Sequence, residues 1–235
     1  MKLFARCLGL FVLAFVALQL YFVGRIAFMV VVNPESTSFQ RSEAWRLLEG
    51  GTLRWSQRWV GYVQLSEHLK RAVLASEDDS FSNHDGVDWE ALEKAWEKNA
   101  KAEQRAARKH TAAKIVGGST ITQQLAKNLF LSGERTLLRK GQELVLTLLL
   151  EQLLSKQRIL EIYLNSVEWG EGVFGAEAAA QHYFRKSAAQ LNAWESARLA
   201  VMLPRPRYFE KLPNSGYLAN RTGIILSRMT NTQLP

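Results

Sequence analysis

An apolar run near the N-terminus is the feature that most constrains how this chain can fold. The eighteen residues from Cys7 to Gly24 include one polar side chain, Gln19. As a helix, the run would be about 27 Å long, which is enough to cross the hydrocarbon core of a bilayer. Lys2 and Arg6 lie on its N-terminal side, and basic residues favour the cytoplasmic side of a membrane. The sequence therefore predicts a transmembrane helix whose N-terminus stays in the cytoplasm.

A cleaved signal peptide is the alternative to a permanent anchor. The run exceeds the apolar region of about 7–15 residues that signal peptides use, and no A-x-A-like cleavage site follows it. We therefore expect a cytoplasmic tip and transmembrane anchor over residues 1–32, and an extracytoplasmic domain over residues 33–235. The single cysteine, Cys7, lies in the anchor, so the outer domain is expected to fold without a disulfide.

The outer domain is predicted to be all-α, because its apolar residues recur at helical rather than strand spacing. The very apolar segment 135–154 is expected to be the buried core helix, and segments 155–165 and 217–229 are expected to be further helices. The segment 90–116 is polar, rich in alanine and basic, which indicates a weakly held helix. Its basic residues over 94–114 could gate a cleft, contact phosphates or form a solvated face.

Three consecutive acids, Glu77, Asp78 and Asp79, precede Phe81 and His84 at short intervals. A calcium-binding EF-hand is excluded, because Phe81 stands where the first ligand belongs. Apolar surroundings and neighbouring acids both raise the pKa of a carboxyl group, which makes a glutamate a usable base or acid near neutrality. A solvated turn is the other interpretation of the same residues.

A helix start is predicted in "GGSTITQQLAKN", where a glycine pair precedes Ser119 and Thr120. Gln123 lies three positions after Thr120, which is the spacing of a capping box. The free N–H groups of a helix start suit an anion. Thr120, Gln124 and Lys127 fall on one polar stripe of this helix.

A cluster of cations follows. Arg135, Arg139 and Lys140 lie within six residues, and Glu143 lies one turn beyond Arg139. A pair at this spacing is commonly a surface salt bridge. The helix is otherwise almost wholly apolar, so we expect the Arg139–Glu143 pair to face a cleft.

Several segments resemble, in order, the motifs of the peptidoglycan glycosyltransferases, which are glycosyltransferase family 51. "EDDSFSNHDG" resembles the signature ED-x-x-F-x-x-H-x-G, and "GGSTITQQLAKNLF" resembles the second motif. "RKGQELVLTLLLEQLLSKQRILEIYLN" resembles the third, while "WESARLAVMLP" and "RTGIILSRM" resemble the weaker fourth and fifth. The resemblance covers roughly residues 65–230. "VEWGEGVFGAEAAAQHYF" further resembles the monofunctional biosynthetic branch, and the sequence contains no S-x-x-K or S-x-N motif of a transpeptidase.

The resemblance implies a lysozyme-like glycosyltransferase domain that polymerises lipid II. The growing chain would pass from its undecaprenyl pyrophosphate carrier to the 4-hydroxyl of lipid II, with inversion to a β-1,4 linkage. By resemblance, Glu77 is the general base, Glu143 is the second essential glutamate, and His84 is structural. The remaining residues that the resemblance assigns to substrate binding are Asp78, Ser119, Thr120, Gln123, Gln124, Lys127, Asn128, Arg135, Arg139 and Lys140.

The resemblance also implies surroundings and partners. The enzyme would be a single-pass protein of the inner membrane with its catalytic domain in the periplasm. Its partners would be lipid II, the nascent glycan strand, membrane lipids and possible cell-wall synthesis or division proteins. Glu143 could orient an arginine or hold a Mg²⁺ or Mn²⁺ ion, and no organic cofactor is expected.

Two other functions remain as alternatives. A muramidase or lytic transglycosylase could use the same lysozyme-like architecture to cut glycan strands, although it protonates a glycosidic oxygen and needs no row of cations. A membrane protein without enzymatic activity could use the formal net charge of +8 to bind anionic lipid or nucleic acid. No nucleic-acid-binding motif occurs in the sequence, so no nucleic-acid partner is expected.

Overall fold

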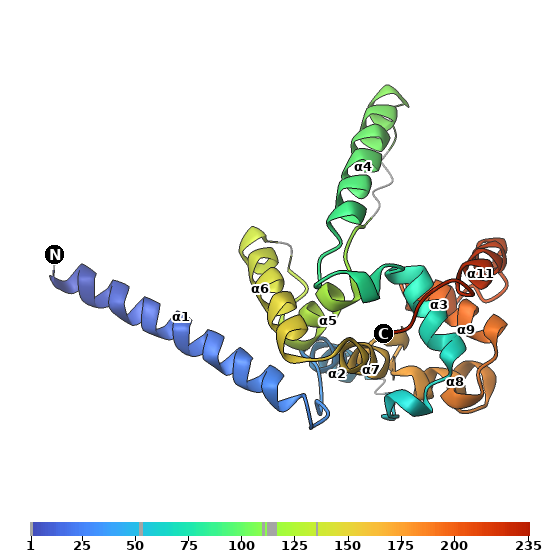
Figure 1. The fold of residues 1–235 in the computed structure, drawn as a ribbon, viewed down its shortest axis with the longest axis horizontal. Helices are drawn as coiled ribbons and strands as arrows, with labels where there is room; N and C mark the ends of the chain where they lie inside the picture. Colours follow the sequence, from blue (N-terminus) through green and yellow to red (C-terminus); the bar gives the residue numbers. More distant parts are fainter. Residues whose placement is uncertain (1, 52–53, 110, 112–116, 135) are drawn as a thin grey trace.

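The computed structural model describes residues 2–51, 54–109, 111, 117–134 and 136–235. Helix α1 (Lys2–Phe28) extends away from the body of the molecule (Figure 1). Among the described residues it is the one helix long and apolar enough to cross a membrane. Its N-terminal half is exposed, whereas Phe22 and Ile26 near its C-terminal end are buried. The predicted apolar helix is therefore present, and its last turns pack on the outer domain.

The part of the chain that the structure describes is otherwise mainly helical, as predicted. The further helices are α2 (Ser38–Glu49), α3 (Glu67–Glu77), α4 (Trp89–Lys109), α5 (Ile121–Phe130), α6 (Leu137–Leu153), α7 (Lys156–Ser166), α8 (Ala176–Phe184), α9 (Ala193–Met202), α10 (Pro206–Glu210) and α11 (Gly216–Arg228). The described ranges also contain the short 3₁₀ helices η1 (Tyr62–Gln64), η2 (Phe81–Asn83) and η3 (Ala188–Gln190).

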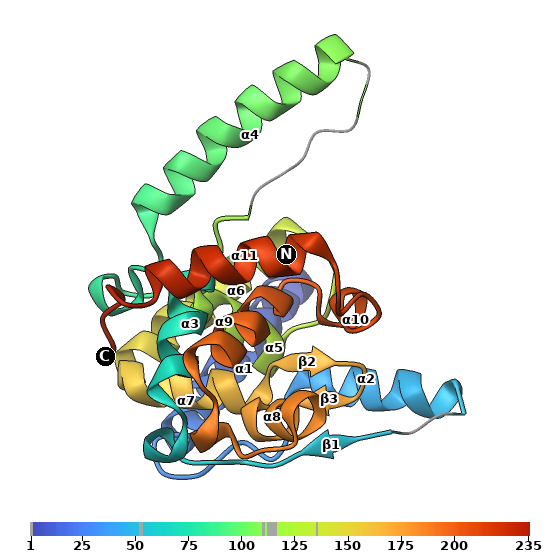
Figure 2. The same cartoon turned by 90° about the vertical axis from the view of Figure 1, so that its right-hand side faces the viewer.

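A small sheet was not foreseen by the all-α prediction. Strand β3 (Val173–Phe174) lies between β1 (Ser56–Gln57), with which it runs parallel, and β2 (Glu168–Gly170), with which it runs antiparallel. The sheet lies beside α2 and α8 (Figure 2). The reversal between β2 and β3 uses Gly172 at φ +72°, a backbone conformation that suits glycine.

Helix α7 is the buried core helix, and the prediction that the apolar segment 135–154 would fill this role holds only in part, because Leu146 and Leu150 are fully buried in the core while other apolar side chains of α6 are exposed. In α7 most side chains from Ile159 to Ser166 are buried. In α6, by contrast, Leu137 is 93% exposed and Leu138 is 87% exposed. Apolar composition identifies a helix that avoids water, but it does not distinguish a helix in the core from one that faces lipid.

Helix α4 projects from the body as a separate arm (Figures 1 and 2). It confirms the predicted helix over Trp89–Lys109, while residues 110 and 112–116 of the predicted segment lie outside the described residues. Trp89 is 69% exposed and Trp96 is 75% exposed, so this helix is held by few contacts.

The candidate site lies where α3 ends and α5 begins. Helix α9 packs against both α3 and α11, which fixes the C-terminal end of α3 (Figure 2). Helix α5 packs against α6, α7 and α2. The end of α3 and the start of α5 lie next to each other, because the backbone N–H of Ile121 donates to Oδ2 of Asp78.

Candidate active site

Glu77 is the last residue of α3 and is half-buried. Its Oε2 accepts a hydrogen bond of 3.0 Å from Nε2 of Gln124 in α5. Burial raises the pKa of Glu77 above its ordinary value, the hydrogen bond from Gln124 opposes that rise, and the neighbouring charge of Asp78 adds to it. The positive charge of Arg221 in α11 also lowers this pKa. Glu77 is thus a carboxylate that holds a proton more readily than an exposed glutamate does.

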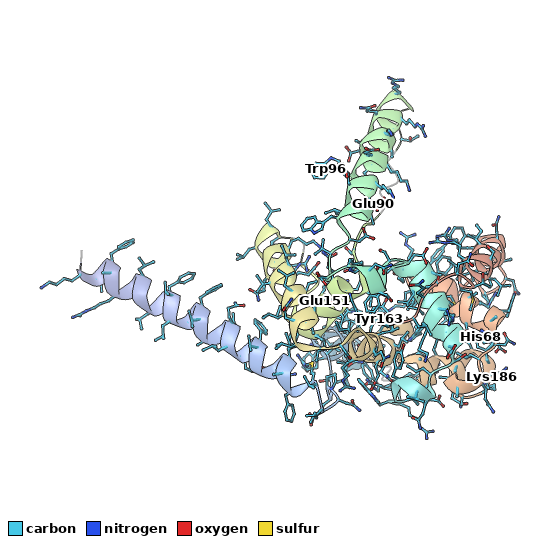
Figure 3. All side chains as sticks on the ribbon, viewed as in Figure 1. His68, Glu90, Trp96, Glu151, Tyr163 and Lys186 are labelled. Carbon is cyan, nitrogen blue, oxygen red and sulfur yellow. The ribbon has the colours of Figure 1, made fainter. Side chains whose placement is uncertain are left out.

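Tyr163 fixes the orientation of Gln124. The hydroxyl of Tyr163 donates a hydrogen bond of 3.0 Å to Oε1 of Gln124, so the amide nitrogen must face Glu77. Tyr163, labelled in Figure 3, is a fully buried residue of α7. Burial and the charge of Glu77 keep the pKa of Tyr163 well above its ordinary value, so its hydroxyl remains a donor. Sequence reasoning did not single out Tyr163, and its place in the third motif was the only signal.

Asp78 ties the end of α3 to the start of α5. Its Oδ2 accepts a hydrogen bond of 2.9 Å from the backbone N–H of Ile121, and its Oδ1 lies 2.8 Å from Nε2 of His84. Nδ1 of His84 accepts from the N–H of Gly86 at 3.1 Å, so Nε2 carries the hydrogen and donates it in the hydrogen bond to Asp78. Both oxygens of Asp78 are therefore engaged by the protein. These contacts fix the backbone next to Glu77, and they agree with the structural role predicted for His84.

The predicted capping box at the start of α5 is confirmed. Thr120 accepts from the backbone N–H of Gln123 through its hydroxyl, and the Gln123 side chain accepts from the N–H of Thr120 at 3.2 Å. The Thr120 hydroxyl also donates to the carbonyl of Gly86 at 2.6 Å. Both side chains are buried and serve first to define the helix start.

A polar cluster under the loop between α3 and α4 was also missed from the sequence. Glu151 of α6, labelled in Figure 3, accepts from the hydroxyl of Thr122 at 2.5 Å and from Nζ of Lys156 at 2.9 Å. Lys156 donates in turn to the carbonyl of His84 at 2.6 Å and lies over the ring of Phe81. These contacts hold the loop that carries His84 against the core.

The predicted cations line a pocket of about 500 Å³ between α5, α6 and α2. As predicted, the Arg139–Glu143 pair faces this cleft: Nη1 of Arg139 lies 2.8 Å from Oε2 of Glu143. Lys140 contacts the other oxygen, Oε1, of Glu143. Nε of Arg139 is buried and has no hydrogen-bond partner within the described part of the chain.

Lys127 lies on the opposite wall of this pocket. Its side chain reaches the open space of the pocket, while the surrounding protein displaces enough water to lower its pKa below the ordinary lysine value. The charge of Glu143 opposes this lowering, and the charges of Arg139 and Lys140 add to it. The pocket is therefore an electropositive nest in which an anionic group would relieve the mutual repulsion of the cations.

The pocket of Glu77 adjoins the pocket of the cations. Ser119 lines both pockets, each of about 500 Å³. Gln124 lines the cation pocket and also donates to Glu77. Asn128 lies on the same pocket wall, one residue after Lys127. Arg135, the remaining predicted binding residue, lies outside the described residues.

The described residues do not fit a resident metal site. Across the described ranges, no three or more His, Cys, Asp or Glu side chains converge. Glu143, the predicted metal ligand, has one oxygen on Arg139 and the other on Lys140. A divalent ion at Glu143 would have to displace two cationic side chains from a single carboxylate.

Comparison with known proteins gives a consistent result. A family model described as transglycosylase matches residues 48–230. The biosynthetic peptidoglycan transglycosylase of Burkholderia thailandensis is 54% identical over 229 residues, which cover 97% of this chain and 86% of that protein. The proteins of the same name from Herminiimonas arsenicoxydans and Janthinobacterium sp. are 53% and 54% identical, each over 95% of this chain and 94% of their own length.

Proposed function

The chain belongs to the transglycosylase family, and on that premise we propose that it is a peptidoglycan glycosyltransferase that polymerises glycan strands from lipid II. The observation that carries this proposal is the shared groove. A carboxylate with a raised pKa and a nest of cations line adjoining pockets that meet at Ser119. Transfer from a pyrophosphate carrier needs both: a base for the incoming hydroxyl and positive charge for the leaving group.

In the proposed reaction Glu77 takes the proton from the acceptor's 4-hydroxyl as its oxygen attacks the anomeric carbon of the donor. A new C–O bond forms to the acceptor, and the bond from the anomeric carbon to the pyrophosphate oxygen breaks. Attack from the face opposite the leaving group inverts the α-linked donor to a β-1,4 linkage. The proton on Glu77 then passes to water, which restores the base for the next transfer.

The pyrophosphate leaves with the bonding electron pair, so negative charge develops at the cation end of the groove. Lys127, Arg139 and Lys140 lie there to stabilise that charge. Glu143 holds Arg139 and Lys140 in place before substrate binds, which means that the cations need little rearrangement during the reaction. A Mg²⁺ or Mn²⁺ ion would arrive with the pyrophosphate under this proposal, since both oxygens of Glu143 contact cationic side chains.

Helix α1 indicates where the proposed enzyme would work in the cell. The lipid carrier of the substrate stays in the bilayer, and α1 would hold the groove at that surface. The basic residues Lys2 and Arg6 favour an orientation with the N-terminus in the cytoplasm and the enzyme domain in the periplasm, attached to the inner membrane. Possible association with other cell-wall synthesis or division proteins remains a prediction.

A muramidase would share part of this geometry, because a glutamate with a raised pKa could also protonate a glycosidic oxygen. The electropositive nest favours pyrophosphate chemistry instead. In the test, the full-length chain is placed in bilayers and is supplied with labelled lipid II or, separately, with purified glycan strands. Formation of long strands from lipid II supports the proposal. Cleavage of the strands without use of lipid II would assign the chain to the hydrolytic or lytic alternative.

A further inference from the structure

The single polar side chain of the apolar run has a partner in the outer domain. Nε2 of Gln19 donates to Oε1 of Gln142 at 3.3 Å, and Nε2 of Gln142 donates back to Oε1 of Gln19 at 3.2 Å. The two residues are 123 positions apart, and both are half-buried between α1 and α6. This is a closed pair of amides, in which each side chain donates one hydrogen bond to the other and accepts one from it.

The pair lies within the part of α1 that would cross the membrane. Gln19 precedes Gly24, the end of the apolar run, by five residues, which corresponds to about 7 Å along a helix. Near the end of the apolar run an amide meets little water, and leaving an amide unpaired against hydrocarbon is costly. The hydrogen bonds between Gln19 and Gln142 are therefore favoured, and they hold Gln142 at the same depth as Gln19.

Further contacts hold α1 against the domain beyond this pair. The ring of Phe22 meets that of Phe130 edge-on at 5.3 Å, and Nε of Arg158 donates to the carbonyl of Met29 at 2.8 Å. Ile26 is fully buried in the core of the domain. From Gln19 onward, α1 is thus a packed element of the domain rather than a flexible tether.

Gln142 also lies beside the cation pocket. It directly precedes Glu143 in α6 and follows Arg139 by three residues, so the three share one turn of the helix. The exposed Leu137 and Leu138 at the start of α6 indicate that this helix enters the lipid as well. A shift of α6 along α1 would move Arg139 and Glu143 by the same amount.

We propose that Gln19 and Gln142 form a positioning pair that sets the depth of the pyrophosphate-binding turn of α6 relative to the bilayer. The inference rests on the proposed function, because it is the pyrophosphate of a membrane-bound donor that requires a fixed depth. The pair does not contact substrate. It acts through Arg139 and Glu143 by holding α6 in register with the anchor.

The kinetic test uses the full-length variants Gln19→Leu, Gln142→Leu and the double variant. Gln157→Leu is the matched control, since Gln157 is exposed and donates to Pro235 O at 2.9 Å on another face of the domain. In bilayers each single variant should lower kcat/KM for lipid II about 3- to 15-fold, as expected for one intramembrane hydrogen-bonded pair. The double variant should be no worse than either single variant, because it leaves no amide unpaired. In detergent micelles, which impose no fixed depth, the losses should be smaller.

Wild-type kinetics of the single variants in bilayers would overturn the proposal. Equal losses in bilayers and micelles, together with a lower melting temperature, would overturn it too, since they would show a merely structural contact. The Gln157→Leu control should match the wild type in both settings.

A second measurement separates this inference from the proposed function. Gln19→Cys and Gln142→Cys are combined with Cys7→Ser, which removes the chain's single native cysteine. A short bifunctional thiol reagent is applied to the chain in membranes without substrate. Cross-linking of the pair, but not of either cysteine alone, supports the contact whether or not the chain polymerises lipid II. Absence of the cross-link in a chain that does polymerise lipid II would overturn the positioning pair and leave the proposed function intact.

Discussion

Replacement of Glu77 by glutamine tests the centre of the proposed chemistry. The change keeps the size of the side chain and leaves an oxygen that can accept from Gln124, but it removes the base. A positioned general base contributes about 10²- to 10⁴-fold to rate, so polymerisation of labelled lipid II should fall by at least about 100-fold. The assay follows glycan length on gels, with the full-length variant in bilayers.

The same variant should be more stable than the wild type near neutral pH. The pKa of Glu77 is raised in the folded protein, so the folded state binds the proton more strongly than the unfolded state does. Stability of the wild type therefore falls as pH rises from the ordinary value of 4.5 through the raised value, and stays at the lower level above it. Each unit of the rise corresponds to about 1.4 kcal/mol. The glutamine variant lacks this loss, because it carries no charge to desolvate.

Thermal melting at several pH values measures this difference. The variant and the wild type should melt alike below pH 4.5, where Glu77 is protonated, and should diverge at neutral pH in favour of the variant. Glu67→Gln is the control, since Glu67 begins the same helix, is 71% exposed at its side chain and pairs with Arg71 on the surface. That control should retain activity and show no comparable gain. A Glu77→Gln variant that still makes full-length glycan, or that melts lower than the wild type at every pH, would refute the reasoning.

Three further substitutions test other parts of the site. Lys127→Ala should lower turnover of lipid II about 100-fold or more, because it removes one charge from the proposed leaving-group pocket. Its melting temperature should be no lower than that of the wild type, because the fold disfavours the charge of Lys127. Turnover near the wild-type rate would contradict this role. Gln124→Leu removes a hydrogen bond that lowers the pKa of Glu77, so the acid limb of the pH–rate profile should move to higher pH. An unmoved limb would show that Gln124 does not lower the pKa of the base. Gly86→Ala should destabilise the fold by about 2 kcal/mol or more in chemical denaturation. The reason is that Gly86 has φ +84° and that a Cβ there would approach Cγ2 of Thr147 to 2.7 Å. A variant as stable as the wild type would disprove the crowding.

Local features of the site could be predicted from the sequence because they depend on residues close together in the chain. The Thr120 capping box follows from a spacing of three, and the Arg139–Glu143 pair follows from one helical turn. Tyr163 could not be placed in this way, because its contact with Gln124 joins α7 to α5 across 39 residues. The Gln19–Gln142 pair spans a still longer separation. Such contacts depend on how the helices pack, and neither spacing nor periodicity encodes that packing.

The exposed leucines of α6 show a different limit of sequence reasoning. Periodicity identified a helix with an apolar side, and the prediction that this helix is buried in the core is wrong for its N-terminal turn, where Leu137 and Leu138 are exposed. The polar residues resolve the ambiguity once the fold is known. Gln142 and the Arg139–Glu143 pair occupy neighbouring positions on α6. Gln142 contacts α1, whereas Arg139 and Glu143 line the cation pocket. Helix α6 therefore lies between α1 and the cation pocket, and this position keeps its N-terminal turn outside the core, where Leu137 and Leu138 are exposed.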